Sequence, residues 1–116
     1  MELIDISNTY PDYTDGFNDA LRFIARFRWT NTDFKVGRTS SSNLKGRLNW
    51  YFRNTDYNYM TLLFQTSSKN RAGKIEIEIQ KHFKDISDNL RDGGGGWGRP
   101  PYYMYIVTIE YPPFLY

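Results

Sequence analysis

The chain has 116 residues, 40% of them hydrophobic and 24% charged, a length and balance typical of one compact globular domain over residues 1–116. It contains no cysteine and one histidine, which excludes a disulfide framework, a thiolate zinc site and a cysteine nucleophile, and argues against a Ser-His-Asp triad. No apolar run approaches the roughly 18 residues of a membrane span, and no signal-peptide pattern opens the sequence. We therefore expect a cytoplasmic protein without a membrane partner.

The first 30 residues predict a lead-in segment followed by a helix. Residues 1–14 show no sustained period, and we expect one short strand in this segment. From residue 15 to residue 28, apolar and polar positions recur at helical spacing on opposite faces, which predicts an amphipathic helix. Apolar residues also alternate over 21–29, so a half-buried strand is the alternative interpretation.

Residues 34–66 predict a strand, a helix and a second strand. The segment FKVGRT indicates a short strand that ends at Gly37, and residues 40–53 indicate a helix. The buried stripe of this helix would comprise Leu44, Leu48 and Tyr51 or Phe52. The run YMTLLFQT, residues 59–66, is bounded by polar clusters and predicts a buried strand.

Residues 67–85 allow two interpretations. The segment IEIEI alternates as a strand would, but apolar residues also recur every three or four positions, at Ala72, Ile75, Ile79 and Phe83. Ser67 or Ser68 offers an N-cap, and the cations at the far end suit a helix C-terminus. We therefore prefer a helix of about four turns.

The C-terminal part begins with a loop and ends in a strand. Residues 92–101 hold five glycines and two prolines, and this composition predicts a loop. The β-branched and aromatic run YYMYIVTIEY marks the clearest strand of the chain, and residues 112–116 form an aromatic tail. The order of elements predicts a small α/β or α+β fold, in which helices cover one sheet.

Charge is distributed unevenly along the chain. Residues 1–20 carry five acids and no base, whereas residues 21–55 carry eight bases and one acid, Asp33. A local excess of this size is typical of a surface that binds phosphates, nucleic acid or an acidic protein. A solvated basic face is the simpler interpretation of the same charges.

The stretch from Phe34 to Asn89, roughly half of the chain, resembles the GIY-YIG nuclease superfamily. FKVGRT is similar to the second named strand of that family, with Lys-Val-Gly in place of Tyr-Ile-Gly. In NLKGRLNWYF, Arg47 and Tyr51 match the arginine and the tyrosine or histidine of the following helix. Glu76 matches the single essential glutamate of the family, and Asn89 is similar in position to an asparagine that follows it.

The resemblance implies a three-stranded, mostly antiparallel sheet flanked by helices, but the first motif of the family has no counterpart before Gly37. The C-terminal strand could take the place of the missing first strand. Tyr103 or Tyr105 would then replace the first named tyrosine, and Lys35 stands where the second is expected. A tyrosine ladder that packs against the sheet is the simpler interpretation of these two tyrosines.

The chemistry of the matched residues is that of phosphodiester hydrolysis. Glu76 would hold Mg²⁺, which typically takes one or two protein carboxylates and keeps most of its waters. Arg47 offers a planar fork to a phosphate, and Tyr51 and Lys35 would position water or substrate. Substrate binding would be assisted by Arg38, Lys45 and Asn89. Three of these residues also have an ordinary interpretation, in which Glu76 is solvated, Arg47 is a surface ion-pair partner and Tyr51 belongs to the core.

The predicted function is therefore that of a small Mg²⁺-dependent endonuclease acting on DNA rather than RNA. A free-standing domain of this kind resembles those of viruses and mobile elements, which implies the host cytoplasm or a virion as its location. The rival hypothesis is an inactive relative that binds nucleic acid, or an interaction or virion structural protein. In that case, the aromatic tail would dock on a protein partner.

Overall fold

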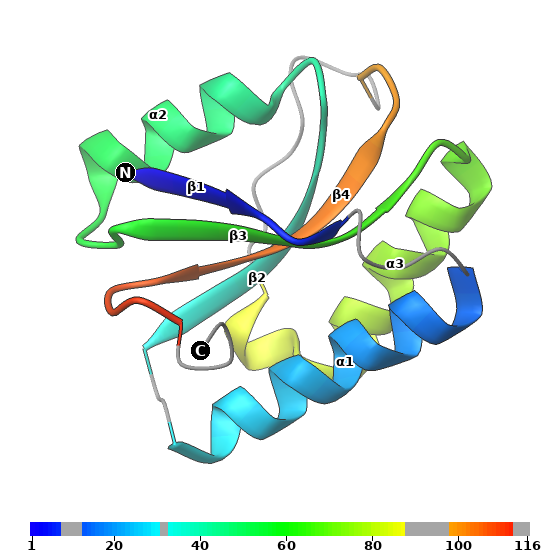
Figure 1. The fold of residues 1–116 in the computed structure, drawn as a ribbon, viewed down its shortest axis with the longest axis horizontal. Helices are drawn as coiled ribbons and strands as arrows, with labels where there is room; N and C mark the ends of the chain where they lie inside the picture. The colour runs from blue at the N-terminus through cyan, green and yellow to red at the C-terminus, as the bar shows by residue number, and fades with distance from the viewer. Residues whose placement is uncertain (8–12, 31–32, 88–97, 113–116) are drawn as a thin grey trace.

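The computed structural model describes residues 1–7, 13–30, 33–87 and 98–112. They form a small α+β fold with three α-helices and one four-stranded sheet (Figure 1). The elements, in chain order, are β1 (Glu2–Asp5), α1 (Tyr13–Thr30), β2 (Phe34–Ser40), α2 (Leu44–Asn54), β3 (Tyr59–Thr66), α3 (Lys69–His82), the 3₁₀-helix η2 (Lys84–Ile86) and β4 (Tyr102–Thr108).

The sheet has the strand order β1-β3-β4-β2. Strand β4 lies between β3 and β2 and is antiparallel to both, whereas β1 is parallel to β3. The expected count of three strands is therefore wrong, because the lead-in segment contributes β1 as an additional edge strand. The C-terminal strand does enter the sheet, and it occupies a central position in it.

The helices cover both faces of the sheet. Helices α1 and α3 lie on one face and α2 lies on the other (Figure 1). The larger core cluster packs between the sheet and the α1 and α3 helices, with Ile24, Ile75 and Met104 almost fully buried. The smaller cluster packs beneath α2 and is centred on Tyr51, Leu62 and Tyr105. The sheet therefore separates two different side-chain environments.

Strand alternation assigns each residue of β2 to one of these environments. Phe34 and Val36 belong to the cluster beneath α1 and α3, so Arg38, two residues further on, points to the same face. Gly37 lies on the α2 face, directly opposite Tyr105 in the β2–β4 register. The strand continues past Gly37 to Ser40, because every residue from Phe34 to Ser40 is paired with β4.

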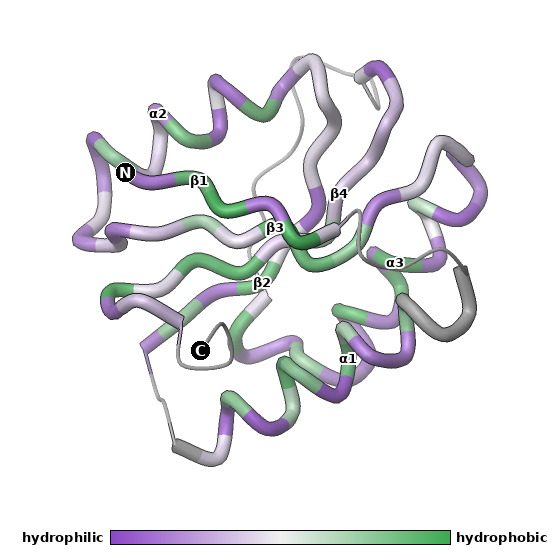
Figure 2. The backbone as a smooth tube through the Cα atoms, viewed as in Figure 1, coloured by the Kyte–Doolittle hydropathy of each residue, from purple (hydrophilic) through white to green (hydrophobic). Residues whose placement is uncertain are grey.

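The two segments whose sequences allowed either a helix or a strand form the helices α1 and α3. Helix α1 alternates between hydrophilic and hydrophobic residues along its length (Figure 2), and its buried residues include Ala20, Ile24 and Phe27. Helix α3 buries Ala72, Ile75 and Ile79, and the Ser68 hydroxyl accepts a hydrogen bond from the Arg71 amide at its start. A helix that lies on the sheet buries an apolar stripe along one of its sides. This packing favours the helical spacing of three or four residues over the strand spacing of two.

The predicted loop and tail are described only in part. Residues 98–101 form no helix or strand and lead into β4. The Ser41 hydroxyl donates to the Arg99 and Pro100 carbonyls, which joins this segment to the end of β2. Residues 92–97 and 113–116 lie outside the described residues.

Candidate functional site

Helix α2 directs two of the predicted site residues inward. Arg47 and Tyr51 are one helical turn apart, so they share a face of α2, and that face packs on the sheet. Arg47 is 6% exposed and Tyr51 is 1% exposed. An arginine is seldom buried to this extent without polar partners, because burial of an unpaired charge is costly.

A polar partner of Arg47 comes from the centre of the sheet. The Tyr105 hydroxyl of β4 accepts a hydrogen bond from Arg47 Nη1 at 3.1 Å, and it lies 2.9 Å from the Tyr51 hydroxyl. The Tyr51 and Tyr105 rings also pack edge to face, with 5.9 Å between their centroids. We call these three residues, Arg47, Tyr51 and Tyr105, the Arg47 cluster. Of the two tyrosines proposed from the sequence, Tyr105 is therefore the one that contacts the predicted arginine.

Gly37 leaves the space that the Tyr105 ring occupies. A Cβ atom added at Gly37 would lie 2.5 Å from Tyr105 Cζ and would also collide with the hydroxyl. Such an approach is far inside van der Waals contact, so any side chain at position 37 would displace Tyr105. The glycine of the sequence motif is thus required for close packing and not for its backbone conformation.

Glu76 lies on the opposite face of the sheet from the Arg47 cluster. It is carried by α3, and its Oε2 atom is 3.5 Å from Nε of Arg38, a residue that points to the α1 and α3 face. The Arg38 side chain is 10% exposed and that of Glu76 is 52% exposed. The structure therefore pairs two predicted site residues, Glu76 and Arg38, but places them across β2 from Arg47 and Tyr51.

The residues near Glu76 fit a Mg²⁺ site only if the protein supplies a single carboxylate ligand. Among the described residues, no group of three or more His, Cys, Asp or Glu side chains could enclose a metal ion. A single half-exposed carboxylate such as Glu76 is compatible with Mg²⁺, which binds through one or two carboxylates and retains its waters. The neighbouring Arg38 guanidinium would compete with such an ion for the same carboxylate.

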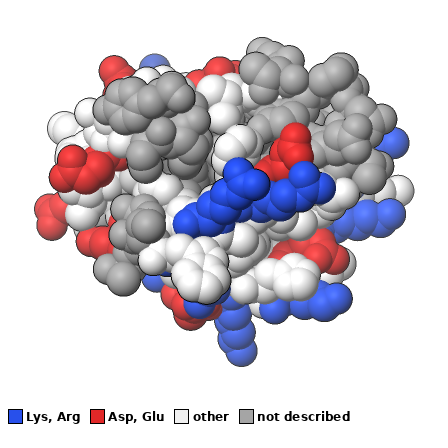
Figure 3. Space-filling model, turned by 60° about the horizontal axis from the view of Figure 1, so that its bottom comes forward, with Lys and Arg blue, Asp and Glu red and all other residues white. Residues whose placement is uncertain are grey.

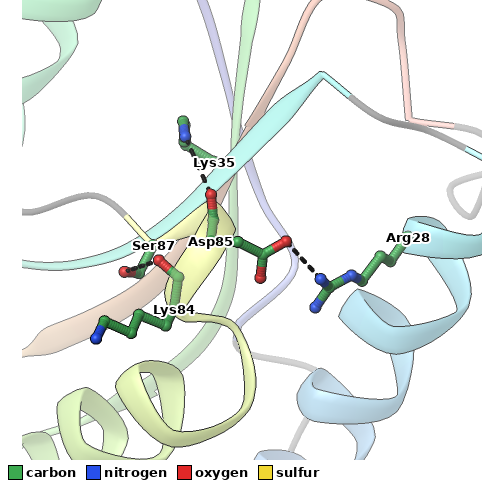
Figure 4. A network of polar contacts seen from close by, with 5 residues as sticks. All are labelled: Arg28, Lys35, Lys84, Asp85 and Ser87. Carbon is green, nitrogen blue, oxygen red and sulfur yellow. Dashed lines mark hydrogen bonds and ion pairs between the residues drawn. The ribbon is translucent and has the colours of Figure 1, made fainter.

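Lys35 is engaged at the edge of the sheet and contacts the segment that follows α3. Its Nζ atom is 3.5 Å from the Asp85 backbone carbonyl, and the Asp85 carboxylate in turn forms an ion pair with Arg28 (Figure 4). Residue Ser87 of the same segment forms an isolated parallel bridge with Val36 of β2. These contacts join the end of α1, the start of β2 and η2, and they give Lys35 a structural partner.

The remaining predicted residues are dispersed. Lys45 is exposed on the first turn of α2, and Asn89 lies outside the described residues. Tyr103 packs at the margin of the cluster beneath α2, where burial and the nearby Asp5 carboxylate raise its pKa. Sequence reasoning missed Asp5, because a four-residue strand is too short to show which of its side chains shares a face with Tyr103.

Comparisons with protein-family models, curated proteins and solved structures found no match for this chain. Among the described residues, no helix combines the length and the apolar character needed to span a membrane.

Proposed function

We propose that this protein is a small metal-dependent endonuclease that hydrolyses DNA phosphodiester bonds. The observation that supports this best is the Arg47 cluster, in which Arg47 donates to the Tyr105 hydroxyl, that hydroxyl contacts the Tyr51 hydroxyl, and Gly37 of β2 leaves space for the Tyr105 ring. Together with Gly37, the residues of the cluster come from three separate elements, β2, α2 and β4. Four of the features expected from the sequence resemblance meet there: the glycine, the arginine, the helix tyrosine and a tyrosine of the C-terminal strand.

Within this proposal, Arg47 binds a non-bridging phosphate oxygen through its planar, permanently charged fork. The buried Tyr105 hydroxyl acts as a positioning group because it accepts a hydrogen bond from the Arg47 guanidinium, and the buried Tyr51 hydroxyl contacts the Tyr105 hydroxyl in turn. Glu76 would hold Mg²⁺, which when bound would supply Lewis-acid activation of water and phosphate. Arg38 and Lys45 attract the DNA backbone as part of the basic stretch 21–55. Such an activity would operate in the cytoplasm of a cell or of an infected host.

A second candidate function is a nucleic-acid-binding or structural protein without catalysis. Two observations favour it: Glu76 and Arg47 lie on opposite faces of β2, and Arg47 is only 6% exposed. Phosphodiester hydrolysis needs the metal-binding and phosphate-binding groups at one phosphate. In this second candidate, Arg47 stabilises the packing of α2, and Glu76 neutralises Arg38.

A cleavage assay separates the two candidates. Supercoiled plasmid would be incubated with the wild-type protein in Mg²⁺, in Ca²⁺ and in a chelator. The endonuclease proposal expects nicked or linear products in Mg²⁺ alone, and a loss of at least about a hundredfold in rate for Glu76→Gln and for Arg47→Lys. DNA binding without any cleavage in Mg²⁺ would favour the second candidate.

Matched control variants exclude trivial explanations of a lost activity. Glu78→Gln removes a neighbouring carboxylate of α3 that pairs with His82, and Arg53→Gln removes an exposed base of α2. Both variants should cut at the wild-type rate. If they lose activity in parallel with Glu76→Gln and Arg47→Lys, surface charge and not a defined site governs cleavage, and the assignment of Glu76 and Arg47 to the site is wrong. Far-UV circular dichroism checks that each variant is folded.

A further inference from the structure

The outer surface of α1 carries an exposed aromatic and basic stripe that lies outside both core clusters of the described residues. Arg22, Arg26 and Trp29 follow one another at intervals of four and three residues, so they lie along one side of the helix. This side is opposite to the buried residues Ala20, Ile24 and Phe27. We call Arg22, Arg26 and Trp29 the α1 stripe.

The side chains of the α1 stripe extend into solvent. Trp29 is 90% exposed, the highest value among the large hydrophobic residues described, and the Arg22 side chain is 68% exposed. Arg26 is exposed and makes no ion pair with a residue that the structure describes, whereas Arg22 pairs with Asp19 at 3.1 Å. On the side of the molecule where α1 comes forward, Lys and Arg side chains gather near the middle of the face (Figure 3).

We propose that the α1 stripe is a binding surface for single-stranded nucleic acid, separate from the Arg47 cluster. A base would stack on the Trp29 indole, and the adjoining phosphates would contact Arg26 and Arg22. A flat exposed ring beside cations at one-turn spacing is the combination that binds unpaired nucleotides, because bases need a π surface and phosphates need positive charge. The α1 stripe and the proposed endonuclease site have in common only that each would bind nucleic acid.

The charge of the stripe selects this occupant over the other candidates. A second copy of the chain that packed through the same stripe would bring arginines of both copies together, which is repulsive. An acidic peptide would satisfy Arg22 and Arg26 but would not need the Trp29 ring. Duplex DNA would satisfy the arginines as well, but its bases are already stacked and are inaccessible to Trp29.

Fluorescence anisotropy with a short labelled oligothymidylate tests the proposal on the full chain, in a chelator so that the oligonucleotide is not cut. Trp29→Ala should weaken binding by roughly ten- to a hundredfold, the usual effect of losing one stacked base. Arg26→Gln should weaken binding and lower the slope of log affinity against log salt by about 0.7, the value for one lost phosphate contact on a single strand. Ile77→Ala and Lys74→Gln are matched controls on α3, because both residues are exposed, and they should bind as the wild type does.

Several results would overturn the proposal. These are an absence of oligothymidylate binding, wild-type affinity of Trp29→Ala, an equal loss in the Ile77→Ala or Lys74→Gln controls, or binding of duplex DNA or polyglutamate that also requires Trp29. A dimer in sedimentation velocity that Trp29→Ala dissociates would overturn it too, in favour of a second copy. Binding that depends on Trp29 without plasmid cleavage supports the stripe and removes the endonuclease. Plasmid cleavage together with oligothymidylate binding that does not depend on Trp29 supports the endonuclease and overturns the proposal for the α1 stripe.

Discussion

The Tyr105 hydroxyl accepts a hydrogen bond from Arg47 at 3.1 Å, although the two residues are separated by 58 positions in the chain. This contact ties helix α2 to the central strand of the sheet at a point where both side chains are buried. A buried hydrogen bond to a charged group is stronger than one between neutral groups, and the loss of one partner leaves the other unsatisfied. The contact is therefore a sensitive place to perturb both stability and the candidate site.

Tyr105→Phe should lower the free energy of unfolding by about 1–3 kcal/mol, because it removes the oxygen that both Arg47 and Tyr51 contact while it keeps the ring. Urea denaturation followed by tryptophan fluorescence measures the change. Tyr103→Phe is the control, since Tyr103 is only half-buried at the margin of the same cluster. Equal effects of the two substitutions would show that the Tyr105 hydroxyl contributes nothing specific.

Gly37→Ala should destabilise the fold by about 1–3 kcal/mol, because its new methyl group would overlap the Tyr105 ring. Gly46→Ala makes the same chemical change at an exposed position of helix α2, where no described residue outside the local helix lies within 4 Å of the added atom. That control should stabilise the protein by about 0.5–1 kcal/mol through helix propensity. The double variant Gly37→Ala/Tyr105→Leu should lose less stability than the two single changes added together, and strict additivity would contradict the proposed overlap.

Glu76→Gln should cost less than about 1 kcal/mol of stability, because the Glu76 side chain is 52% exposed and the 3.5 Å between its Oε2 atom and Arg38 Nε is long for an ion pair. The variant should therefore be folded under assay conditions, so that a lost activity can be attributed to chemistry. A double-mutant cycle with Arg38→Gln, read by thermal unfolding, measures the coupling between the two side chains. A coupling well above 1 kcal/mol would mean that Glu76 serves mainly as a structural partner.

The stability of the protein should decrease at alkaline pH partly through Tyr57. Burial raises the pKa of Tyr57 above the ordinary value of 10.0, and its hydrogen bond to the Asp33 carboxylate at 2.9 Å raises the pKa further. The folded state therefore holds this proton more tightly than the unfolded state, so the contribution is complete below pH 10.0 and is lost as the pH rises above it. Urea titrations across this range should show a shallower decline for Tyr57→Phe than for the wild type.

Thr61→Val should leave stability unchanged or raise it slightly. The Thr61 side chain is fully buried in β3, and its hydroxyl has no hydrogen-bond partner among the described residues. Valine has nearly the same shape, so the substitution removes an unsatisfied polar atom without opening a cavity. Chemical denaturation measures the difference, with Thr108→Val as the comparison, because the Thr108 hydroxyl does donate to the Glu110 carbonyl. A clear loss at Thr61 would contradict the assignment of an unsatisfied hydroxyl.

The local elements were predictable because their signals are local. Strand β3 has the bounds expected from YMTLLFQT, since a buried apolar run between polar clusters needs no partner to be identified. Helix α3 was identified over the alternating IEIEI pattern by its three- and four-residue apolar spacing and its serine cap. The candidate site was predictable only as a list of residues, from a resemblance that selected Arg47, Tyr51 and Glu76.

The arrangement of those residues depended on contacts between distant parts of the chain. The sequence alone determined that the chain is an α+β domain, that Arg47 and Tyr51 share one helix face, and that the C-terminal run is a strand. The tertiary structure decided that Tyr105 in that strand meets Arg47, that β1 adds a parallel edge, and that Glu76 lies with Arg38 on the other face. Strand register and the face on which each helix packs cause this difference, because successive residues of a strand point to opposite sides and only long-range pairing determines which residues meet.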